Sequence, residues 1–261
     1  MRISCLQMDM ALGRVEENFA HAEDMIRQAM AQQPDVIVLP EMWNTGFFPR
    51  ENLAALADRD GQMVKNRIGA LAKEFSVNIV AGSVANVREG KVYNTSFVFD
   101  REGTCIASYD KTHLFSPMGE DDYFTPGDHM CRFTLDGMSC GVIICYDIRF
   151  PELTRSLALQ GLDMLFVVSQ WPDVRIAHLE TLLQARAIEN QIFVVCCNSC
   201  AQAGDTKYGG HSAVVDPWGQ IISQAKNEEK VLTTQTNVCI LTDIRNSIHV
   251  FRDRRSELYR L

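Results

Sequence analysis

Residues 141–153 read GVIICYDIRFPEL and contain two patterns that follow each other directly. The first four residues form a short apolar run rich in β-branched side chains, which is typical of a strand covered on both faces. The residues after Cys145 begin a helical pattern, with Pro151 in its early turns, where proline is favoured. A buried strand that leads directly into a helix indicates an α/β fold.

The same alternation continues on both sides of this segment. Apolar runs typical of strands occur at residues 36–39, 77–81, 164–168 and 192–195, and strands that end in turns are indicated at 93–99 and 212–216. Apolar residues at helical spacing occur at 15–32, 62–75 and 176–189. We therefore predict an α/β protein whose helices cover its sheets; this pattern alone fits both a three-layer sheet and a four-layer sandwich.

The composition is that of an ordinary globular protein with one sizeable core. The chain has 261 residues, of which 46% are hydrophobic, and no linker or repeat divides it. Its 25 Lys and Arg against 33 Asp and Glu give a net charge of −8, which argues against nucleic acid or an anionic membrane as a partner. No stretch approaches the ~18 apolar residues that cross a membrane.

The nine cysteines are odd in number, irregularly spaced and often placed inside apolar runs. This usage predicts reduced core thiols, and with a first strand that begins almost at Met1 it predicts a cytoplasmic protein. Cys197 and Cys200 form a C-x-x-C pair that could instead serve a redox or metal site. Since only single histidines are available as further ligands, buried packing thiols are the preferred interpretation.

Three residues with complementary chemistry follow predicted strands, where α/β folds usually place their active sites. They are Glu41, Lys111 and Cys145. A thiol at a helix N-terminus faces the positive end of the helix dipole, so we expect a lowered pKa and a thiolate. A carboxylate that moves protons and an ammonium that stabilises an oxyanion would complete a set for acyl transfer. Taken alone, a Cys after an apolar strand is more often a packed core thiol, and a Glu or Lys at a strand end is usually a solvated terminus.

Three segments of the chain resemble the signature blocks of the nitrilase superfamily of carbon–nitrogen hydrolases, in that family's order. They are residues 39–47 (LPEMWNTGF), 109–115 (YDKTHLF) and 141–153. The likeness continues to residues 254–259 and so covers essentially the whole chain. It implies a four-layer αββα sandwich, a single domain over residues 1–261, a small-molecule amide as substrate, and no cofactor or metal.

The resemblance also implies a role for each residue of the set. Cys145 corresponds to the nucleophile, Glu41 to the general base and Lys111 to the cation that stabilises the oxyanion. The backbone N–H of Tyr146 would complete the oxyanion hole. We expect Lys111→Ala and Glu41→Gln to fold normally and to be nearly inactive, since one missing oxyanion donor typically costs about 10²–10³ in rate.

The family has a second glutamate in the loop after the lysine block. We match Glu120 to it, although Asp121 and Asp122 follow directly in the sequence and could take the same place. The expected role of this carboxylate is to orient Lys111 and the substrate or leaving group.

A fourth set of segments, residues 169–172, 185–191 and 42–47, resembles the ω-amidase branch of the superfamily. Those enzymes hydrolyse the terminal amide of short dicarboxylic monoamides such as α-ketoglutaramate and α-ketosuccinamate. A substrate of this kind carries a carboxylate at its far end, and Arg175 is our candidate to bind it bidentately. Trp171, Phe47 and Tyr123 could line the pocket, although aromatic residues in such runs are as often part of the core.

Several other functions share the same residues. A nitrilase, a carbamoylase or an aliphatic amidase would use the same triad, and the ω-amidase reading is favoured by the segment around Trp171. A catalytically silent binding protein with this fold is disfavoured by the intact triad. A thiol-based metal or redox sensor using Cys197 and Cys200 is the second alternative from a different class.

The resemblance further implies a homodimer, with the C-terminal tail at about 245–261 contributing to the interface. Near the nucleophile, Asp147 and Arg149 are expected to form an ion pair that supports the turn around Cys145.

Overall fold

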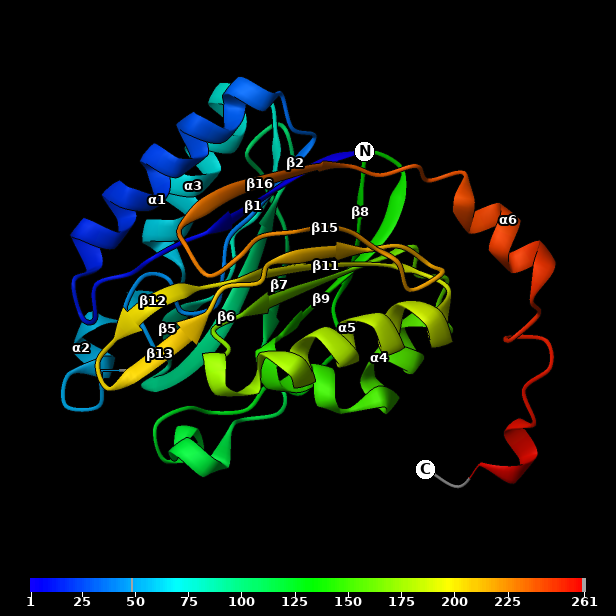
Figure 1. The fold of residues 1–261 in the computed structure, drawn as a ribbon. Coiled ribbons are helices and arrows are strands. Elements are labelled where there is room, and N and C mark those ends of the chain that lie inside the picture. The colour runs from blue at the N-terminus through cyan, green and yellow to red at the C-terminus, as the bar shows by residue number, and fades with distance from the viewer. Residues whose placement is uncertain (48, 260–261) are drawn as a thin grey trace.

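Two β-sheets lie face to face at the centre of the molecule in the computed structural model, which describes residues 1–47 and 49–259 (Figure 1). The eight-stranded sheet has the order β16 (Lys230–Gln235), β1 (Arg2–Gln7), β2 (Val36–Val38), β4 (Asn78–Val80), β6 (Lys91–Phe99), β5 (Val84–Arg88) and β3 (Asp58–Arg59), with β7 (Cys105–Asp110) also paired to β6. The six-stranded sheet has the order β15 (Ile221–Gln224), β14 (Ala213–Val215), β11 (Phe193–Asn198), β10 (Met164–Ser169), β9 (Met138–Ile144) and β8 (Arg132–Leu135). Strands β12 (Cys200–Ala203) and β13 (Thr206–Gly209) form a separate hairpin.

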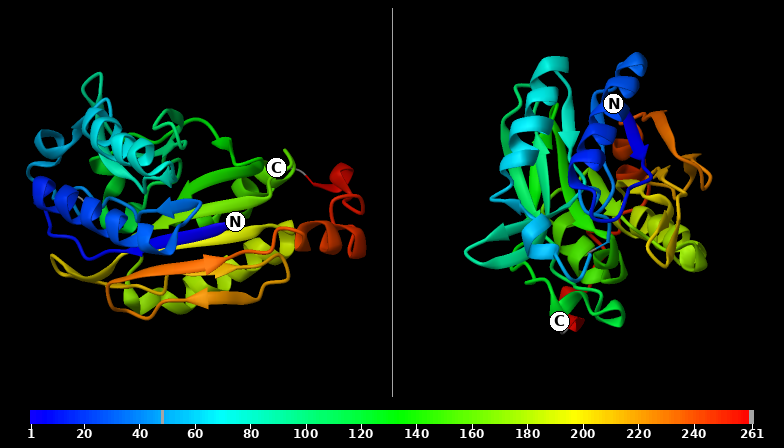
Figure 2. Two further views of the ribbon diagram at one scale, coloured as in Figure 1. Left: turned by 90° about the horizontal axis from the view of Figure 1, so that it is seen from above. Right: turned by 90° about the vertical axis from the view of Figure 1, so that its left-hand side faces the viewer.

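Helices cover the outer face of each sheet, as the left-hand view of Figure 2 shows. The first sheet carries α1 (Val15–Ala29) and α3 (Gln62–Phe75), and the second carries α4 (Pro151–Ala158) and α5 (Ile176–Asn190). A short helix, α2 (Leu53–Leu56), precedes β3, and α6 (Ile240–Ser247) follows β16. The architecture is therefore a four-layer αββα sandwich, which confirms the fold that the resemblance implies.

The alternation of side chains along the strands produces these layers. In β2, Val36 and Val38 pack against the second sheet, whereas Ile37 joins the cluster that faces α1 and α3. Period-two alternation places successive side chains on opposite faces of a sheet, so a fully apolar strand serves two layers at once. This is why the central strands read as continuous apolar runs in the sequence.

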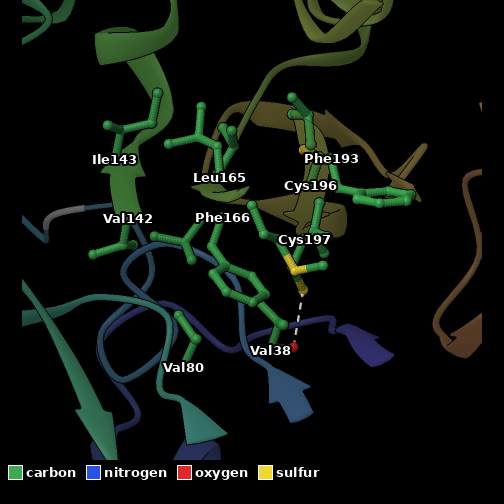
Figure 3. Packing of buried hydrophobic residues seen from close by; sticks show 14 of the residues in the cluster. Val38, Val80, Val142, Ile143, Leu165, Phe166, Phe193, Cys196 and Cys197 are labelled. Atoms are coloured by element: carbon green, nitrogen blue, oxygen red, sulfur yellow. Dashed lines mark hydrogen bonds between the residues drawn. The ribbon is translucent and has the colours of Figure 1, made fainter. Parts of the chain in front are cut away.

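Buried apolar side chains fill the core between the two sheets (Figure 3). Val38 and Val80 of the first sheet face Phe166 and Cys197 of the second. The thiol of Cys197 donates a hydrogen bond to the carbonyl oxygen of Val38 at 3.2 Å, which ties the two sheets together at their centre.

The helices and strands indicated by the sequence agree with these bounds to within a few residues. The predicted helices at 62–75 and 176–189 correspond to α3 and α5, and the predicted helix at 15–32 divides into α1 and a 3₁₀ turn, η1 (Met30–Gln32). Among the described residues no helix is both long and apolar enough to cross a membrane. Figure 1 shows α6 and the segment that follows it extending away from the two sheets.

Candidate active site

Four ionisable side chains that are distant in sequence meet beyond the ends of strands from both sheets. Glu41 lies three residues after β2, Lys111 directly follows β7, and Cys145 directly follows β9. Glu120 begins the 3₁₀ turn η3 (Glu120–Asp122) in the loop after Lys111. The structure thus brings together all four residues that the resemblance assigns to catalysis.

The segment that carries Glu41 is fixed by a close approach of two backbones. Ser83 donates its N–H to the carbonyl oxygen of Pro40 at 3.0 Å. A Cβ atom on Gly82 would lie 2.0 Å from that same oxygen, and Gly82 has φ +59°. Only glycine fits such a position, so this contact holds the backbone directly before Glu41 in one place.

Lys111 is held between two carboxylates in a site closed to solvent. Its Nζ lies 2.8 Å from Oε1 of Glu41 and 3.0 and 2.9 Å from the two carboxylate oxygens of Glu120. All three side chains are fully buried, at 0% exposure. An ammonium has three N–H donors, so when the Glu120 oxygens share one of them a third remains for a substrate.

Backbone and amide donors fix both carboxylates. Asn94 on β6 donates from Nδ2 to Glu41 at 2.9 Å and to Glu120 at 3.3 Å. The N–H of Gln170 donates to Oε2 of Glu41 at 2.9 Å, and the N–H of Phe115 donates to Glu120 at 2.6 Å. The sequence analysis missed Asn94; its only signal was a polar amide inside the predicted strand at 93–99.

Burial and neighbouring charges together raise the pKa values of Glu41 and Lys111. Burial is the main cause of a raised pKa for Glu41, and the charge of Glu120 adds to it while Lys111 opposes it. Burial alone would lower the pKa of Lys111, but the charges of Glu120 and Glu41 prevail and raise it well above its ordinary value. The lysine therefore stays charged, and Glu41 is a base of increased strength.

The pKa of Cys145 is raised, which corrects the expectation of a lowered pKa and a thiolate. Cys145 opens the 3₁₀ turn η4 (Cys145–Arg149) and does not stand at the start of α4. Burial raises its pKa, and the neighbouring charge of Glu41 raises it further despite Lys111. The thiol and the Glu41 carboxylate are close enough that each affects the pKa of the other. A carboxylate beside a protonated thiol can accept its proton.

A pocket that opens to the surface is lined by Cys145 and Lys111. Its walls are mainly aromatic, apolar and cationic, and consist of Phe47, Phe115, Met118, Tyr146, Arg149, Gln170, Trp171, Pro172 and Arg175. Apolar and aromatic walls with a few polar and charged groups are typical of a site for a small molecule. Phe115 and Met118 were missed by the sequence analysis, although Phe115 closes the segment 109–115.

Two arginines line this pocket, each with its guanidinium over an aromatic ring. Cζ of Arg149 lies 4.7 Å from the ring centre of Trp171, and Cζ of Arg175 lies 5.5 Å from that of Phe115. Neither forms an ion pair with a carboxylate in the part of the chain that the structure describes. Such guanidiniums are available to bind an anionic group of a ligand.

The structure places Tyr123 apart from this pocket. It is 38% exposed and borders a surface hollow beside Asp122 and the segment 50–55. Phe47, Trp171 and Arg175, the other residues considered for the substrate, all line the pocket with Cys145.

The expected ion pair between Asp147 and Arg149 is wrong. Asp147 is fully buried and takes His113 as its partner, with Nδ1 at 2.8 Å from Oδ1. Arg149 instead stacks on Trp171, because η4 directs the two side chains to different sides of the turn.

Cys197 and Cys200 are buried on different strands. The thiol of Cys197 donates to the carbonyl oxygens of Leu6 and Val38, at 3.3 and 3.2 Å. Across residues 1–47 and 49–259, no three His, Cys, Asp or Glu side chains are grouped so that they could hold a metal ion. These contacts favour a packing role for both thiols.

The comparison with protein families identifies the class of protein to which this fold and this site belong. The family model described as carbon-nitrogen hydrolase matches residues 2–244. The chain belongs to the carbon–nitrogen hydrolase family.

Similar proteins come from bacteria, animals and yeast. The chain is 42% identical to the 2-oxoglutaramate amidase of Bacillus subtilis over 257 residues, covering 98% of each chain. It is 32% identical to the human omega-amidase NIT2, covering 99% of this chain and 96% of the other. Nit3 from Saccharomyces cerevisiae, a member of branch 10 of the nitrilase superfamily, superposes with a TM-score of 0.91 at 26% identity, covering 98% of this chain and 96% of that one.

Proposed function

We propose that this carbon–nitrogen hydrolase is an ω-amidase. It would cleave the terminal amide of short dicarboxylic or 2-keto-dicarboxylic monoamides, such as α-ketoglutaramate and α-ketosuccinamate, to the acid and ammonia. The observation that carries this proposal is a small pocket with Cys145 and Lys111 at its base and the unpaired Arg175 in its wall. The full-length similarity to a 2-oxoglutaramate amidase and to omega-amidases supports it.

The acylation step uses all four residues. As the Cys145 sulfur attacks the amide carbon, Glu41 takes the thiol proton, and the carbonyl oxygen becomes an oxyanion. Lys111 and the N–H of Tyr146 stabilise this charge, while Glu120 keeps the ammonium in place. Glu41 then gives its proton to the amide nitrogen, the carbon–nitrogen bond breaks, and ammonia leaves a thioester on Cys145.

The same groups then hydrolyse the thioester, with water as the nucleophile and the Cys145 sulfur as the leaving group. Glu41, again ionised, removes a proton from water as the water oxygen attacks the thioester carbonyl. Lys111 and the N–H of Tyr146 stabilise the second oxyanion. When it collapses, the carbon–sulfur bond breaks, the acid leaves, and the thiol recovers its proton. Two acyl transfers thus replace one difficult hydrolysis.

Ammonia release from a panel of amides tests the proposal. The panel contains α-ketoglutaramate, α-ketosuccinamate, succinamate and glutamine, with Cys145→Ala as the inactive control. Release from a keto-acid or dicarboxylate monoamide that is lost in the variant would support an ω-amidase. If none of the four is hydrolysed, the proposal is wrong, and aliphatic amides, nitriles and N-carbamoyl compounds would then identify an aliphatic amidase, a nitrilase or a carbamoylase.

Arg175→Ala is expected to weaken the reaction with carboxylate-bearing amides. A hydrogen-bonded ion pair contributes about 1.5–3 kcal/mol, so kcat/KM for succinamate should fall by about 10–100-fold. A neutral amide of similar length, butyramide, has no carboxylate and should react at an unchanged rate. Steady-state kinetics with both amides show whether Arg175 binds the carboxylate or only supports the pocket. Equal losses of kcat/KM for the two amides would mean that it only supports the pocket.

We further propose that residues 1–261 act as one domain in a homodimer. Ile188 on α5 and Trp218 are 52% and 47% exposed, and Gln184 of α5 donates to the carbonyl oxygen of Gly219 at 2.9 Å, which places the two apolar side chains near each other. Arg155 on α4 lies 5.5 Å from the ring of Phe251, so the tail at about 245–261 borders the same helices.

Sedimentation velocity tests this interface. The native chain should sediment with twice the mass of one chain, and Trp218→Asp should shift it towards the monomer because it places a charge in an apolar contact. Val174→Asp is the matched control, since Val174 is 80% exposed on a different surface. A dimer that both variants leave intact would exclude Trp218 from the interface.

We also propose a cytoplasmic location. All nine cysteines are free thiols, and seven of them are buried. Reduced thiols in this number are typical of proteins that work in a reducing compartment.

A further inference from the structure

The backbone at Cys145 adopts a conformation that side-chain-bearing residues avoid. Its φ is +47°, in the left-handed region. This conformation brings Cβ close to the following carbonyl and persists only where the surroundings enforce it. The residue on the amino-terminal side of the turn, Ile144, donates its N–H to Oδ2 of Asp147 at 2.9 Å. Asp147 is thus part of what holds the nucleophile in this conformation.

The carboxylate of Asp147 accepts five hydrogen bonds although it is fully buried. Oδ2 accepts from Ile144 and from the hydroxyl of Tyr109 at 2.8 Å. Oδ1 accepts from the hydroxyl of Thr112 at 3.1 Å, from the N–H of His113 at 3.0 Å and from Nδ1 of His113 at 2.8 Å. A buried carboxylate with this many donors is fixed in position and in orientation.

The donors come from both sides of Lys111. Tyr109 precedes it by two residues in β7 of the eight-stranded sheet, and Thr112 and His113 follow it. Ile144 belongs to β9 of the six-stranded sheet. One carboxylate therefore joins the segment that carries the ammonium to the turn that carries the sulfur.

Three further features keep this network in one arrangement. The His113 ring stacks on Phe150 with ring centres 3.7 Å apart and an angle of 10° between the planes. Burial raises the pKa of Tyr109, and the charge of Asp147 raises it further, so the phenol remains a donor. Arg149 is directed to Trp171 and does not compete for the carboxylate.

We propose that Asp147 is a positioning residue that fixes the separation of the Cys145 sulfur and the Lys111 ammonium. This inference rests on the proposed function, in which both groups act on one carbonyl group. The sulfur must reach the carbon while the ammonium reaches the oxygen, and a shift of about 1 Å in such a geometry can cost about 10²-fold in rate. Asp147 itself touches neither the substrate nor the reacting atoms.

Asp147→Asn is the direct test. An amide offers one acceptor oxygen, and its NH₂ group would face N–H or O–H donors in either orientation. With the amide that the native protein hydrolyses best, kcat should fall by about 10²-fold, while KM stays within about twofold because Arg175 and the pocket walls are unchanged.

Asp58→Asn is the matched control for loss of a buried carboxylate. Asp58 is 2% exposed and accepts the N–H groups of Met63 and Val64 at 3.0 Å each, at the start of α3 and outside the site. This variant should lose stability and keep its kcat. Alkylation of Cys145 by iodoacetamide adds a second readout: this reaction forms no oxyanion, so Asp147→Asn should slow it much less than amide hydrolysis.

Tyr109→Phe tests the same network in case Asp147→Asn does not fold. It removes one of the five donors, and kcat should fall by about tenfold. Because Tyr109 acts through Asp147, the double variant should be no slower than Asp147→Asn alone. A native kcat in Asp147→Asn, or in Tyr109→Phe where only that variant folds, overturns the positioning role. A native protein that hydrolyses no amide overturns the proposed function, and the inference with it.

Discussion

Lys111→Met is expected to abolish amide hydrolysis and to destabilise the protein. The ammonium is the oxyanion's charged donor in the proposed mechanism, and losing one such donor costs about 10²–10³ in rate. It is also the cation between two fully buried carboxylates. Removing one partner of a buried ion pair typically costs about 3–5 kcal/mol, and the free energy of unfolding from denaturant titration should fall by about this amount.

The burial of Lys111 between two carboxylates revises the expectation from the sequence that a variant at this position folds normally. The loss of stability should depend on pH. Lys111 opposes the raised pKa of Glu41, so without the ammonium the folded-state pKa of Glu41 lies further above its unfolded value. The folded state is then favoured when Glu41 is protonated and loses stability as pH rises. The defect should therefore be smaller at about pH 5 than at about pH 8.

A charge-neutral variant separates the two effects. In Lys111→Met/Glu41→Gln/Glu120→Gln the buried carboxylates are also removed, so stability should largely return while activity does not. If Lys111→Met alone kept more than roughly a tenth of the native rate, the lysine could not be the oxyanion's main donor.

The sequence pattern was sufficient to predict an α/β fold because its strands are apolar on both faces. Runs such as 36–39 and 164–168 cannot be exposed on either side, so they require helices or a second sheet on both. The number of layers, three or four, could not be predicted from the same pattern. It depends on which strands pair and which sheet faces meet, and it came from the resemblance and not from the periodicity.

The candidate site, too, could be predicted only in part from the sequence. Three acidic residues, Glu120, Asp121 and Asp122, were equivalent in the sequence, and only their burial distinguishes them: Glu120 is fully buried, whereas the two aspartates are exposed. The protonation state of Cys145 was misjudged because it depends on burial and on the charge of Glu41, which is 104 residues away in the chain. Burial and the proximity of a distant charged residue both depend on the tertiary fold, so the spacing of residues in the sequence does not predict them.

Glu41→Gln should be nearly inactive and yet well folded. Glutamine keeps an acceptor for Asn94 or for the N–H of Gln170, and Lys111 keeps Glu120 as its counter-ion. The glutamine cannot take the thiol proton, protonate the leaving amide nitrogen or activate water. General acid–base catalysis typically contributes about 10²–10⁴-fold, so we expect kcat to fall by about 10³-fold at an unchanged melting temperature.

The same substitution should make the thiol ionise more readily. The negative charge of Glu41 is one of the causes of the raised pKa of Cys145, so removing that charge should lower the apparent pKa in the pH profile of iodoacetamide alkylation. In the native protein, amide hydrolysis should be lost as pH falls through the raised pKa of Glu41, and the residual rate of the variant should lack this acid limb. A variant that gains thiolate while losing hydrolysis would show that Glu41 acts as a base and not as a device for keeping the cysteine ionised. If the pH profile of alkylation is unchanged, the charge of Glu41 does not affect the pKa of the Cys145 thiol. The proposed proton transfer between the two residues would then be wrong.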